Sequence, residues 1–209
     1  MTGYFVTGTD TNVGKTVLSA LLVAALDAVY WKPVQTGAIE GTDREAVRRW
    51  AEAGEDRLPP ERFQFDPPVS PHLAAREAGV MIALNALAFP PAAAGRRWIV
   101  EGAGGVMVPL NEHDLMRDLM RRIGLPVIVA ARTSLGTINH TLLTLAALRE
   151  AHLAICGVAL IGDENAENRH AIEHYGKVRM IGRIPMLKQI DRAALLAAYE
   201  QYFDHKVFS

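Results

Sequence analysis

The residues with the clearest chemical potential in this 209-residue sequence are residues 8–16, which read GTDTNVGKT. A glycine-containing loop that ends in Gly-Lys-Thr can wrap an anion, because its backbone N–H groups and the start of the following helix point at the bound charge. Lys15 would then contact the outer phosphates of a nucleotide, and the hydroxyl of Thr16 would bind Mg²⁺. The segment therefore predicts a phosphate-binding loop.

The elements around this loop are those that such a loop requires. Residues 4–7 form an apolar run that predicts a strand, and residues 17–26 predict a buried helix. The spacing departs from the usual pattern, because five residues rather than four separate the first glycine from Gly-Lys-Thr, and Thr9 stands where that glycine is expected. An ordinary glycine-rich turn is the alternative, but Gly-Lys-Thr between a strand and a helix favours phosphate binding.

Apolar runs alternate with segments of helical spacing along the rest of the chain. Strands are predicted at residues 28–31, 97–101, 126–131, 154–161 and 179–184, and helices at residues 43–53, 70–77, 81–88, 114–123, 137–150, 166–175 and 191–203. Residues 54–69, rich in proline and charge, predict an irregular surface segment. The alternation predicts a single domain, residues 1–209, of the α/β class with a mostly parallel sheet and helices on both faces.

Composition argues against several classes of partner. The formal net charge is −1, so nothing indicates the basic stripe of a nucleic-acid-binding protein. No apolar run approaches the ~18 residues of a membrane helix, and the N-terminus lacks the pattern of a signal peptide. The single cysteine, Cys156, lies in an apolar run and predicts a buried thiol, which fits a reducing cytoplasm.

Polar and glycine-rich segments follow the predicted strands. Lys32 follows the second strand, and Glu101 ends the third just before the glycine-rich residues 102–105. Ligands bind outside the carboxyl ends of the strands in an open α/β sheet, so we expect these segments to meet at one edge. Glu101 is then a candidate Mg²⁺ ligand, with a solvated acid as the alternative. Lys32 would ordinarily be interpreted as a surface lysine. Its position at a strand end beside the predicted phosphate site favours a role in stabilising negative charge.

For two residue pairs and one single residue, an ordinary structural role is favoured over a functional one. His170 and His174 have a spacing that can hold a metal, but no third ligand accompanies them, so a solvent-facing pair is favoured. Met116 and Met120 have helical spacing and predict core packing. From its pattern alone, Asp43 is a solvated residue at a helix start.

The whole set of motifs resembles the dethiobiotin synthetase family, ATP-dependent carboxylases that form the ureido ring of a biotin precursor. The resemblance covers most of the chain, and the longer phosphate loop is usual in that family. It rests on residues 6–11 and 13–16, Lys32-Pro33-Val34 with Thr36-Gly37, Ser70-Pro71-His72, and residues 100–105, 135–140 and 182–185.

The resemblance implies a role for each matching residue. Contacts with the carbamate and the transferred phosphoryl group are implied for Thr11, Lys15 and Lys32, and Mg²⁺ ligation for Thr16, Asp43 and Glu101. Nucleotide contacts are implied for Asn12, Val13, Gly14, Lys15, Thr16, Val17, Asp43, Glu101, Gly102, Ala103, Gly104, Gly162, Ile184, Pro185 and Met186. Substrate contacts are implied for Thr36, Ser70, Gly136, Thr137, Ile138 and Asn139, the last four across a homodimer interface.

The reaction that the resemblance implies is that of an ATP-dependent cyclo-ligase. One amine of 7,8-diaminopelargonate reacts with CO₂ to give a carbamate, ATP converts the carbamate to a carbamic–phosphoric anhydride, and the second amine closes the ring of dethiobiotin. One departure concerns the nucleotide base. The family often reads adenine with an asparagine after the penultimate strand, where this chain has Gly162, so recognition would rest on backbone groups near Gly162 and Pro185.

A regulatory P-loop ATPase of the partition or septum-positioning kind is the main alternative. Such proteins usually carry a signature lysine early in the loop, at the place that Asp10 holds here. Some also end in a basic amphipathic membrane helix, whereas residues 191–203 are largely apolar and poor in lysine. A nucleotide-binding module that lacks a fused partner domain is a third possibility.

Overall fold

A six-stranded sheet forms the centre of the computed structural model, which describes residues 2–90 and 95–209. The strand order is β2-β5-β1-β6-β7-β8, and each neighbouring pair is parallel. The strands are β1 (Gly3–Gly8), β2 (Val29–Trp31), β5 (Trp98–Gly105), β6 (Val127–Arg132), β7 (Ile155–Ile161) and β8 (Met180–Ile184). The arrangement confirms the predicted α/β class.

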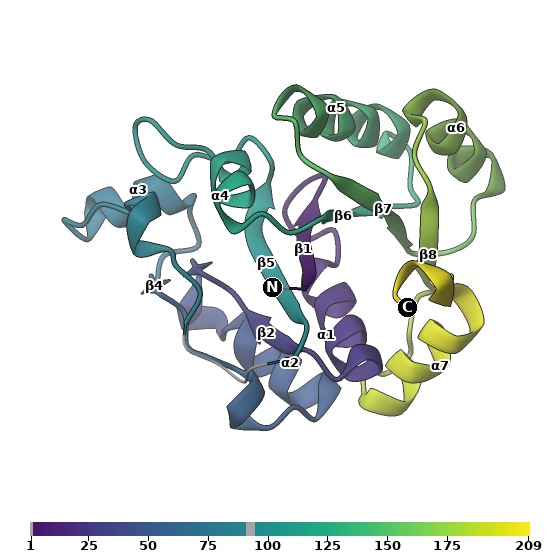
Figure 1. Ribbon diagram of the computed structural model, residues 1–209, viewed down its shortest axis with the longest axis horizontal. Coiled ribbons are helices and arrows are strands. Elements are labelled where there is room, and N and C mark those ends of the chain that lie inside the picture. The colour runs from purple at the N-terminus through teal and green to yellow at the C-terminus, as the bar shows by residue number, and fades with distance from the viewer. Residues whose placement is uncertain (1, 91–94) are drawn as a thin grey trace.

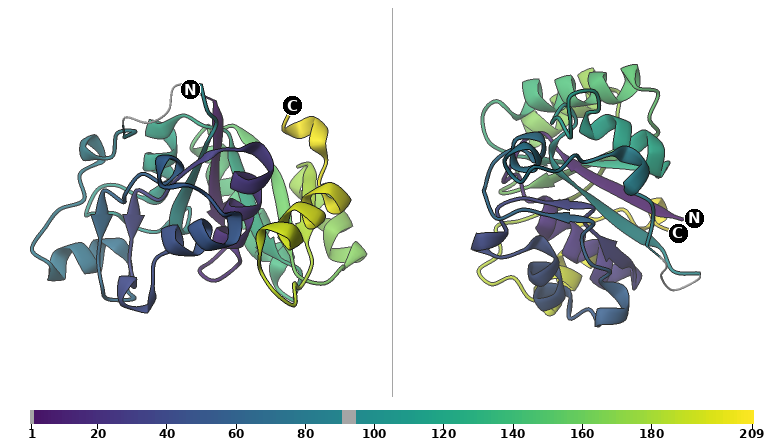
Figure 2. Two further views of the ribbon diagram at one scale, coloured as in Figure 1. Left: turned by 90° about the horizontal axis from the view of Figure 1, so that it is seen from below. Right: turned by 90° about the vertical axis from the view of Figure 1, so that its left-hand side faces the viewer.

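Helices cover both faces of this sheet (Figures 1 and 2). One layer contains α1 (Lys15–Leu26), α2 (Asp43–Ala51) and α7 (Arg192–Tyr202), and the other contains α4 (Met116–Ile123), α5 (Thr137–Glu150) and α6 (Ala166–Gly176). The short helix α3 (Pro71–Glu77) lies beyond the β2 edge, near α4. Helix α7 packs against α1 and buries Leu195, Ala198 and Tyr199, as its apolar sequence predicts.

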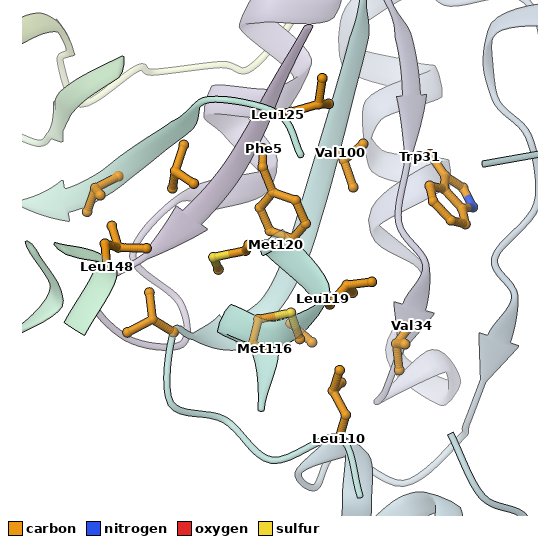
Figure 3. Close-up of a cluster of buried hydrophobic side chains, with 14 of the residues drawn as sticks. Phe5, Trp31, Val34, Val100, Leu110, Met116, Leu119, Met120, Leu125 and Leu148 are labelled. Carbon is orange, nitrogen blue, oxygen red and sulfur yellow. The ribbon is translucent and has the colours of Figure 1, made fainter. Parts of the chain in front are cut away.

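The two helical layers enclose two separate cores, because alternate residues of each strand face opposite sides. Phe5 and Val100 face the layer of α4 and α5, and Figure 3 shows Met116 and Met120 packed beside them. Tyr30 and Ile99 belong to the core under α1. Both methionines are buried, which confirms their predicted core role.

A second, two-stranded sheet corrects the prediction of irregular structure for residues 54–69. Strand β4 (Phe63–Gln64) pairs in parallel with β3 (Val34–Gln35), and a 3₁₀ turn, η2 (Glu55–Arg57), precedes it. The backbone N–H groups of Arg62 and Phe63 both donate to the carbonyl of Pro33. This segment therefore lies beside the residues that follow β2.

The prediction of a helix at residues 81–88 is wrong. Only a 3₁₀ turn, η3 (Leu84–Ala86), forms there, preceded by extended backbone at Ala83. Ile82 and Leu87 are fully buried on either side of the turn. Their side chains reach the core from irregular backbone, so their apolar spacing does not require a helix. Short 3₁₀ turns also form at η1 (Ala38–Glu40) and η4 (His205–Val207).

Two further differences concern single residues. Glu101 does not end its strand, because β5 continues to Gly105, which pairs with Gly8 beyond a register shift. Cys156 is half-buried rather than buried, and burial raises the pKa of its thiol to about 11. His170 and His174 are exposed, as expected.

The connections between strands determine where a ligand can bind. The chain leaves β1 through α1 toward β2, whereas it leaves β6 through α5 toward β7, and β1 and β6 are neighbours. In a parallel sheet, strand ends with diverging connections form a crevice for ligands. The loop after β1 lies at the edge of the molecule opposite the N-terminus (Figure 2). Among the described residues, no helix has both the length and the apolar character to span a bilayer.

Candidate active site

The loop between β1 and α1 has the strained backbone of an anion-binding turn. Asn12 (φ 57°) and Gly14 (φ 95°) both adopt left-handed conformations, and α1 begins at the next residue, Lys15. A Cβ atom on Gly14 would lie 2.9 Å from Cγ2 of Ile161, so only glycine fits between the loop and β7. Arg132 braces the loop from β6, because its Nη2 donates to the carbonyls of Thr11 (3.3 Å) and Asn12 (3.1 Å).

Lys15 folds back over this loop. Its Nζ donates to the carbonyl of Asp10 at 2.9 Å, and 7% of the residue is exposed. Burial lowers the pKa of Lys15 from 10.5 to about 8, and the nearby charge of Glu101 offsets only part of that effect. An anion bound in the loop would replace the carbonyl as the partner of this ammonium group.

Glu101 is the centre of the polar cluster beneath the loop. It is 1% exposed, yet its carboxylate accepts four hydrogen bonds. Oε1 accepts from Thr16 Oγ1 and Lys32 Nζ, both at 3.1 Å, and Oε2 accepts from Ser19 Oγ at 2.7 Å and Tyr30 OH at 3.1 Å. A buried carboxylate needs such partners, because hydrogen bonds to a charged group replace its lost hydration.

Two simple periodicities bring these donors together. Thr16 and Ser19 are three residues apart on α1, so their side chains lie on one face of that helix. Tyr30, on β2, pairs with Ile99 on β5, and alternation places Lys32 and Glu101 two residues further along on the same face. Helix α1 covers that face. Glu101 therefore meets Tyr30 on β2, Lys32 just after that strand, and two residues one turn apart on α1.

Lys32 and Asp43 complete the cluster. Lys32 Nζ lies 2.5 Å from Asp43 Oδ2 and 3.1 Å from Glu101 Oε1, and 5% of the lysine side chain is exposed. Burial lowers the pKa of Lys32, but the charges of Glu101 and Asp43 outweigh it and hold that pKa above its ordinary value. Burial raises the pKa of Asp43, and the Lys32 charge outweighs it, so that pKa is lowered. Lys32 is thus a buried charge, and not a surface lysine.

Asp43 reaches the cluster because helix α2 begins there. Thr42 caps the helix, with its side chain accepting from the N–H of Glu45, and the N–H of Asp43 donates to Gln35 Oε1 at 3.2 Å. Thr16 Oγ1 donates to Asp43 Oδ1 at 2.9 Å. The carboxylate that sequence pattern alone would leave in solvent is therefore fixed against the phosphate loop.

A cavity of about 750 Å³ opens over this cluster. It collects most of the residues for which the family resemblance implies catalysis, nucleotide contact, substrate contact or metal ligation. These are Thr11, Asn12, Gly14, Lys15, Thr16, Val17, Lys32, Thr36, Asp43, Ser70, Glu101, Ala103 and Gly104. Segments that are far apart in the chain therefore share one cavity at the carboxyl edge of the sheet.

Two groups of expected residues lie outside the lining of this cavity. Gly136 caps the N-terminus of α5, so residues 136–139 present the start of a helix elsewhere on the surface. At the end of β7, the N–H of Gly162 donates to the carbonyl of Ile184 at 2.9 Å, and Met186 is 72% exposed. Val13 and Gly102 are also absent from the lining: Val13 is buried, and Gly102 packs against Phe5 and Met116.

Sequence reasoning missed three side chains that support the site, and it predicted for a fourth, Arg132, only a place at the end of a strand. Ser19 and Tyr30 donate to Glu101, Gln35 accepts from the backbone of Asp43, and Arg132 braces the loop. A signal existed for two of them, because Ser19 follows Thr16 by three helical residues and Tyr30 precedes Lys32 by two strand residues. Gln35 and Arg132 act through backbone groups, which no residue spacing reveals.

The donor set of the cluster fits a hard cation. Thr16, Asp43 and Glu101 offer one hydroxyl and two carboxylates, with Thr16 Oγ1 within 3.1 Å of an oxygen from each acid. Mg²⁺ favours one or two carboxylates and completes its shell with phosphates and water. Within residues 2–90 and 95–209, no group of three or more His, Cys, Asp or Glu side chains could hold a metal ion.

The fold and the loop define a P-loop nucleotide-binding domain. A family model described as an AAA domain matches residues 2–194. The solved structure of a ParA family ATPase from Chlorobium tepidum TLS has the same fold, with a TM-score of 0.53 and 15% identity over 95% of this chain and 90% of that one.

Curated relatives show which family of P-loop proteins this chain belongs to. ATP-dependent dethiobiotin synthetase BioD from Rhodopseudomonas palustris (strain TIE-1) is 48% identical, covering 97% of this chain and 95% of its own length. The proteins of the same description from Bradyrhizobium sp. (strain BTAi1) and Paramagnetospirillum magneticum (strain AMB-1) are 49% and 50% identical, covering 98% and 93% of this chain and 97% and 93% of their own lengths. The chain belongs to the ATP-dependent dethiobiotin synthetase family.

Proposed function

We propose that this chain carboxylates 7,8-diaminopelargonate with CO₂ and closes the ring of dethiobiotin at the expense of ATP. The observation that carries the proposal is the meeting of Lys15, Thr16, Lys32, Asp43 and Glu101 in one cavity. Two lysines in this cluster can neutralise charge on a transferring phosphoryl group, and the cavity is large enough for a triphosphate with a small substrate beside it.

The chemistry asks the protein mainly for alignment and charge neutralisation. An unprotonated amine attacks CO₂, and the new carbamate oxygen attacks the γ-phosphorus of ATP while ADP leaves. The second amine then attacks the carbamate carbon, loses a proton and expels inorganic phosphate as the ring closes. Thr11, Lys15 and Lys32 are proposed to contact the carbamate and the transferred group, because in-line phosphoryl transfer needs fixed geometry and nearby cations.

Thr16, Asp43 and Glu101 are proposed to hold Mg²⁺ together with the nucleotide phosphates. When bound there, the ion would neutralise negative charge on the phosphate oxygens. Lys32, which lies between these two carboxylates, would contact the carbamate from the same cluster. Residues 12–17 are proposed to cradle the phosphates, with Ala103 and Gly104 lining the same cavity.

The diamine is proposed to contact Thr36 and Ser70 within the cavity and residues 136–139 of a second copy. Free N–H groups at the start of α5 can receive a carboxylate. Leu135, directly before that helix, and Leu143, on it, are large exposed apolar side chains, which supports burial by a partner. Sedimentation should show a homodimer that Leu135→Glu dissociates, whereas Met186→Glu, which also replaces an exposed apolar residue but lies far from α5 in the sequence, leaves it intact. A monomeric native chain would contradict this arrangement.

The nucleotide base is proposed to lie near Gly162 and residues 184–186. The N–H and carbonyl of Gly162 already bond to Ile184 and Arg183, so the shape of the site and the remaining backbone groups would have to read the base. We also propose a cytoplasmic location, where ATP and CO₂ are available.

Product detection tests the main proposal. Protein, diamine, bicarbonate and Mg-ATP should yield one dethiobiotin and one ADP per cycle, identified by mass. ATP hydrolysis should depend strongly on the diamine, whereas diamine-independent hydrolysis without product would favour a nucleotide switch. The ParA-like fold alone does not favour the switch, because the helix that could serve as a membrane anchor, α7, packs against α1.

A further inference from the structure

The two oxygens of the Glu101 carboxylate have different surroundings. Oε1 faces Thr16 and Lys32, which both line the cavity. Oε2 accepts from Ser19 Oγ at 2.7 Å and Tyr30 OH at 3.1 Å. Ser19 and Tyr30 are fully buried and are not among the residues that line the cavity. Neither hydroxyl can therefore touch a nucleotide or substrate.

We propose that Ser19 and Tyr30 are positioning residues that anchor Oε2 of Glu101 and thereby present Oε1 to the bound Mg²⁺. The inference rests on the proposed function in one respect, which is that Glu101 binds the ion. Beyond that function, it proposes that one carboxylate oxygen binds the ion while the other is held in place by two residues that contact neither the ion nor the substrate.

The geometry explains why two donors are needed. A glutamate side chain turns about its last torsion at little cost, because that torsion is broad. One hydrogen bond to Oε2 would leave the plane of the carboxylate free to rotate about the bonded oxygen. Ser19 comes from α1 and Tyr30 from β2, so the two bonds reach Oε2 from different elements and fix the plane. Outer partners of this kind are known to orient metal ligands and tune their affinity.

The donor role of Tyr30 is stable over the working pH range. Burial, with the charges of Glu101 and Asp43, raises the pKa of Tyr30 well above 10, so its hydroxyl keeps its proton. Other charged groups around it are Lys32, which bonds to Oε1 of the same carboxylate, and Glu61, whose charge further raises the Tyr30 pKa. A protonated phenol can only strengthen the anchoring of a carboxylate.

Ion binding can be measured without turnover. In the first measurement, Mg²⁺ is titrated into the native chain, Tyr30→Phe and Ser19→Ala, each in the presence of a non-hydrolysable ATP analogue. In the second, calorimetry measures the affinity of each protein for the analogue, once with Mg²⁺ and once with EDTA. Each variant should raise the Mg²⁺ concentration for half-saturation about tenfold, as loss of an outer partner does. Affinity for the analogue in EDTA should stay within twofold, because neither hydroxyl contacts the nucleotide.

Matched variants separate positioning from mere packing. Tyr4→Phe removes a phenol that donates to the carbonyl of Val207, away from the cavity, and should leave the Mg²⁺ titration unchanged. Ser19→Thr keeps a hydroxyl and should restore most of the affinity lost in Ser19→Ala. Thermal unfolding identifies any variant that does not fold, and Ser19→Ala, with a good helix former inside α1, keeps the test available if Tyr30→Phe fails to fold.

Two results overturn the inference. One is an unchanged Mg²⁺ titration in folded Tyr30→Phe and Ser19→Ala, and the other is an equal loss of affinity in EDTA, which would indicate general distortion. Failure of the proposed function looks different, because the native chain itself would then show no Mg²⁺-dependent binding of the analogue.

Discussion

The ammonium of Lys32 lies 3.1 Å from Oε1 of Glu101, and both side chains are almost completely buried. Asp43 shares the same ammonium at 2.5 Å, so one lysine bridges two carboxylates. Breaking a buried pair by removing one partner is costly, because the remaining charge has no hydration. The cluster is therefore expected to be energetically coupled.

A double-mutant cycle measures that coupling. Glu101→Gln should lower the free energy of unfolding by roughly 3 kcal/mol, because it leaves Lys32 with Asp43 alone and adds a poorer acceptor for three hydroxyls. Lys32→Met in the Glu101→Gln background should cost less than Lys32→Met alone. Urea unfolding of the four proteins checks this, and simple additivity within about 0.5 kcal/mol would show that the two side chains act independently.

Lys15→Gln tests the role of the loop lysine. Turnover should fall by orders of magnitude, because a cation beside a transferring phosphoryl group contributes several kcal/mol to the transition state. The fold should persist, since within the part of the chain that the structure describes the side chain of Lys15 donates a hydrogen bond only to the carbonyl of Asp10. Lys206→Gln, an exposed lysine in η4, serves as the control and should retain native turnover. Near-native turnover of Lys15→Gln would refute the assignment.

The lowered pKa of Lys15 predicts a pH dependence of nucleotide binding. At about 8, this pKa lies below its ordinary value of 10.5, so at pH 8.5 much of the free protein carries a neutral lysine. Bound phosphates favour the charged form, so binding should take up a proton and weaken as pH rises above 8. Calorimetry in buffers of different ionisation enthalpy measures the proton, and an identical heat in all buffers would contradict the prediction.

The same shift affects stability in the absence of nucleotide. Between pH 8 and 10.5 the unfolded chain binds more protons at Lys15 than the folded chain does, so this group makes unfolding harder as pH rises through that window. The Lys15→Gln variant should lack this contribution. Denaturant unfolding of both proteins at pH 7.5 and 9.5 gives the comparison.

Gly14→Ala should abolish tight nucleotide binding. Its φ of 95° strains any side chain, and the new Cβ would lie 2.9 Å from Ile161, so the loop must move. Gly124→Ala is the matched control, with a φ of 72° at the end of α4 and no atom within 4 Å of its Cβ position. It should cost about 1 kcal/mol of stability and leave binding unchanged. Equal binding by both variants would show that the loop tolerates displacement.

Much of the fold was accessible from the sequence, because buried parallel strands read as continuous apolar runs. The predicted helix at residues 137–150 matches α5, and the strand at 154–161 differs from β7 by one residue. The failures lie where tertiary contacts override local pattern. Residues 81–88 bury Ile82 and Leu87 without a helix, and β4 forms only because β3 lies beside it.

In the candidate site, too, some residues could be predicted from local sequence pattern and others depend on tertiary contacts. Lys15, Lys32 and Glu101 could be selected because each stands at a motif or near a strand end. Asp43 could not be selected from its pattern, because its place in the cluster depends on how Gln35 and Thr42 fix the start of α2. The position of Glu101 inside β5, rather than at its end, also depends on pairing with β1.

Strand β2 is three residues long and forms the outer edge of the six-stranded sheet, where it pairs with β5 alone. Its side chains are nevertheless buried, with Val29, Tyr30 and Trp31 each at most 1% exposed, so packing against the two cores holds the strand in place. Tyr30 lies within this strand and Lys32 directly follows it, so fraying of three residues would remove both from Glu101. A substitution that loosens the packing of this short strand would therefore separate the charged groups of the cluster while the rest of the sheet keeps its pairing, and hydrogen exchange at β2 would detect that change.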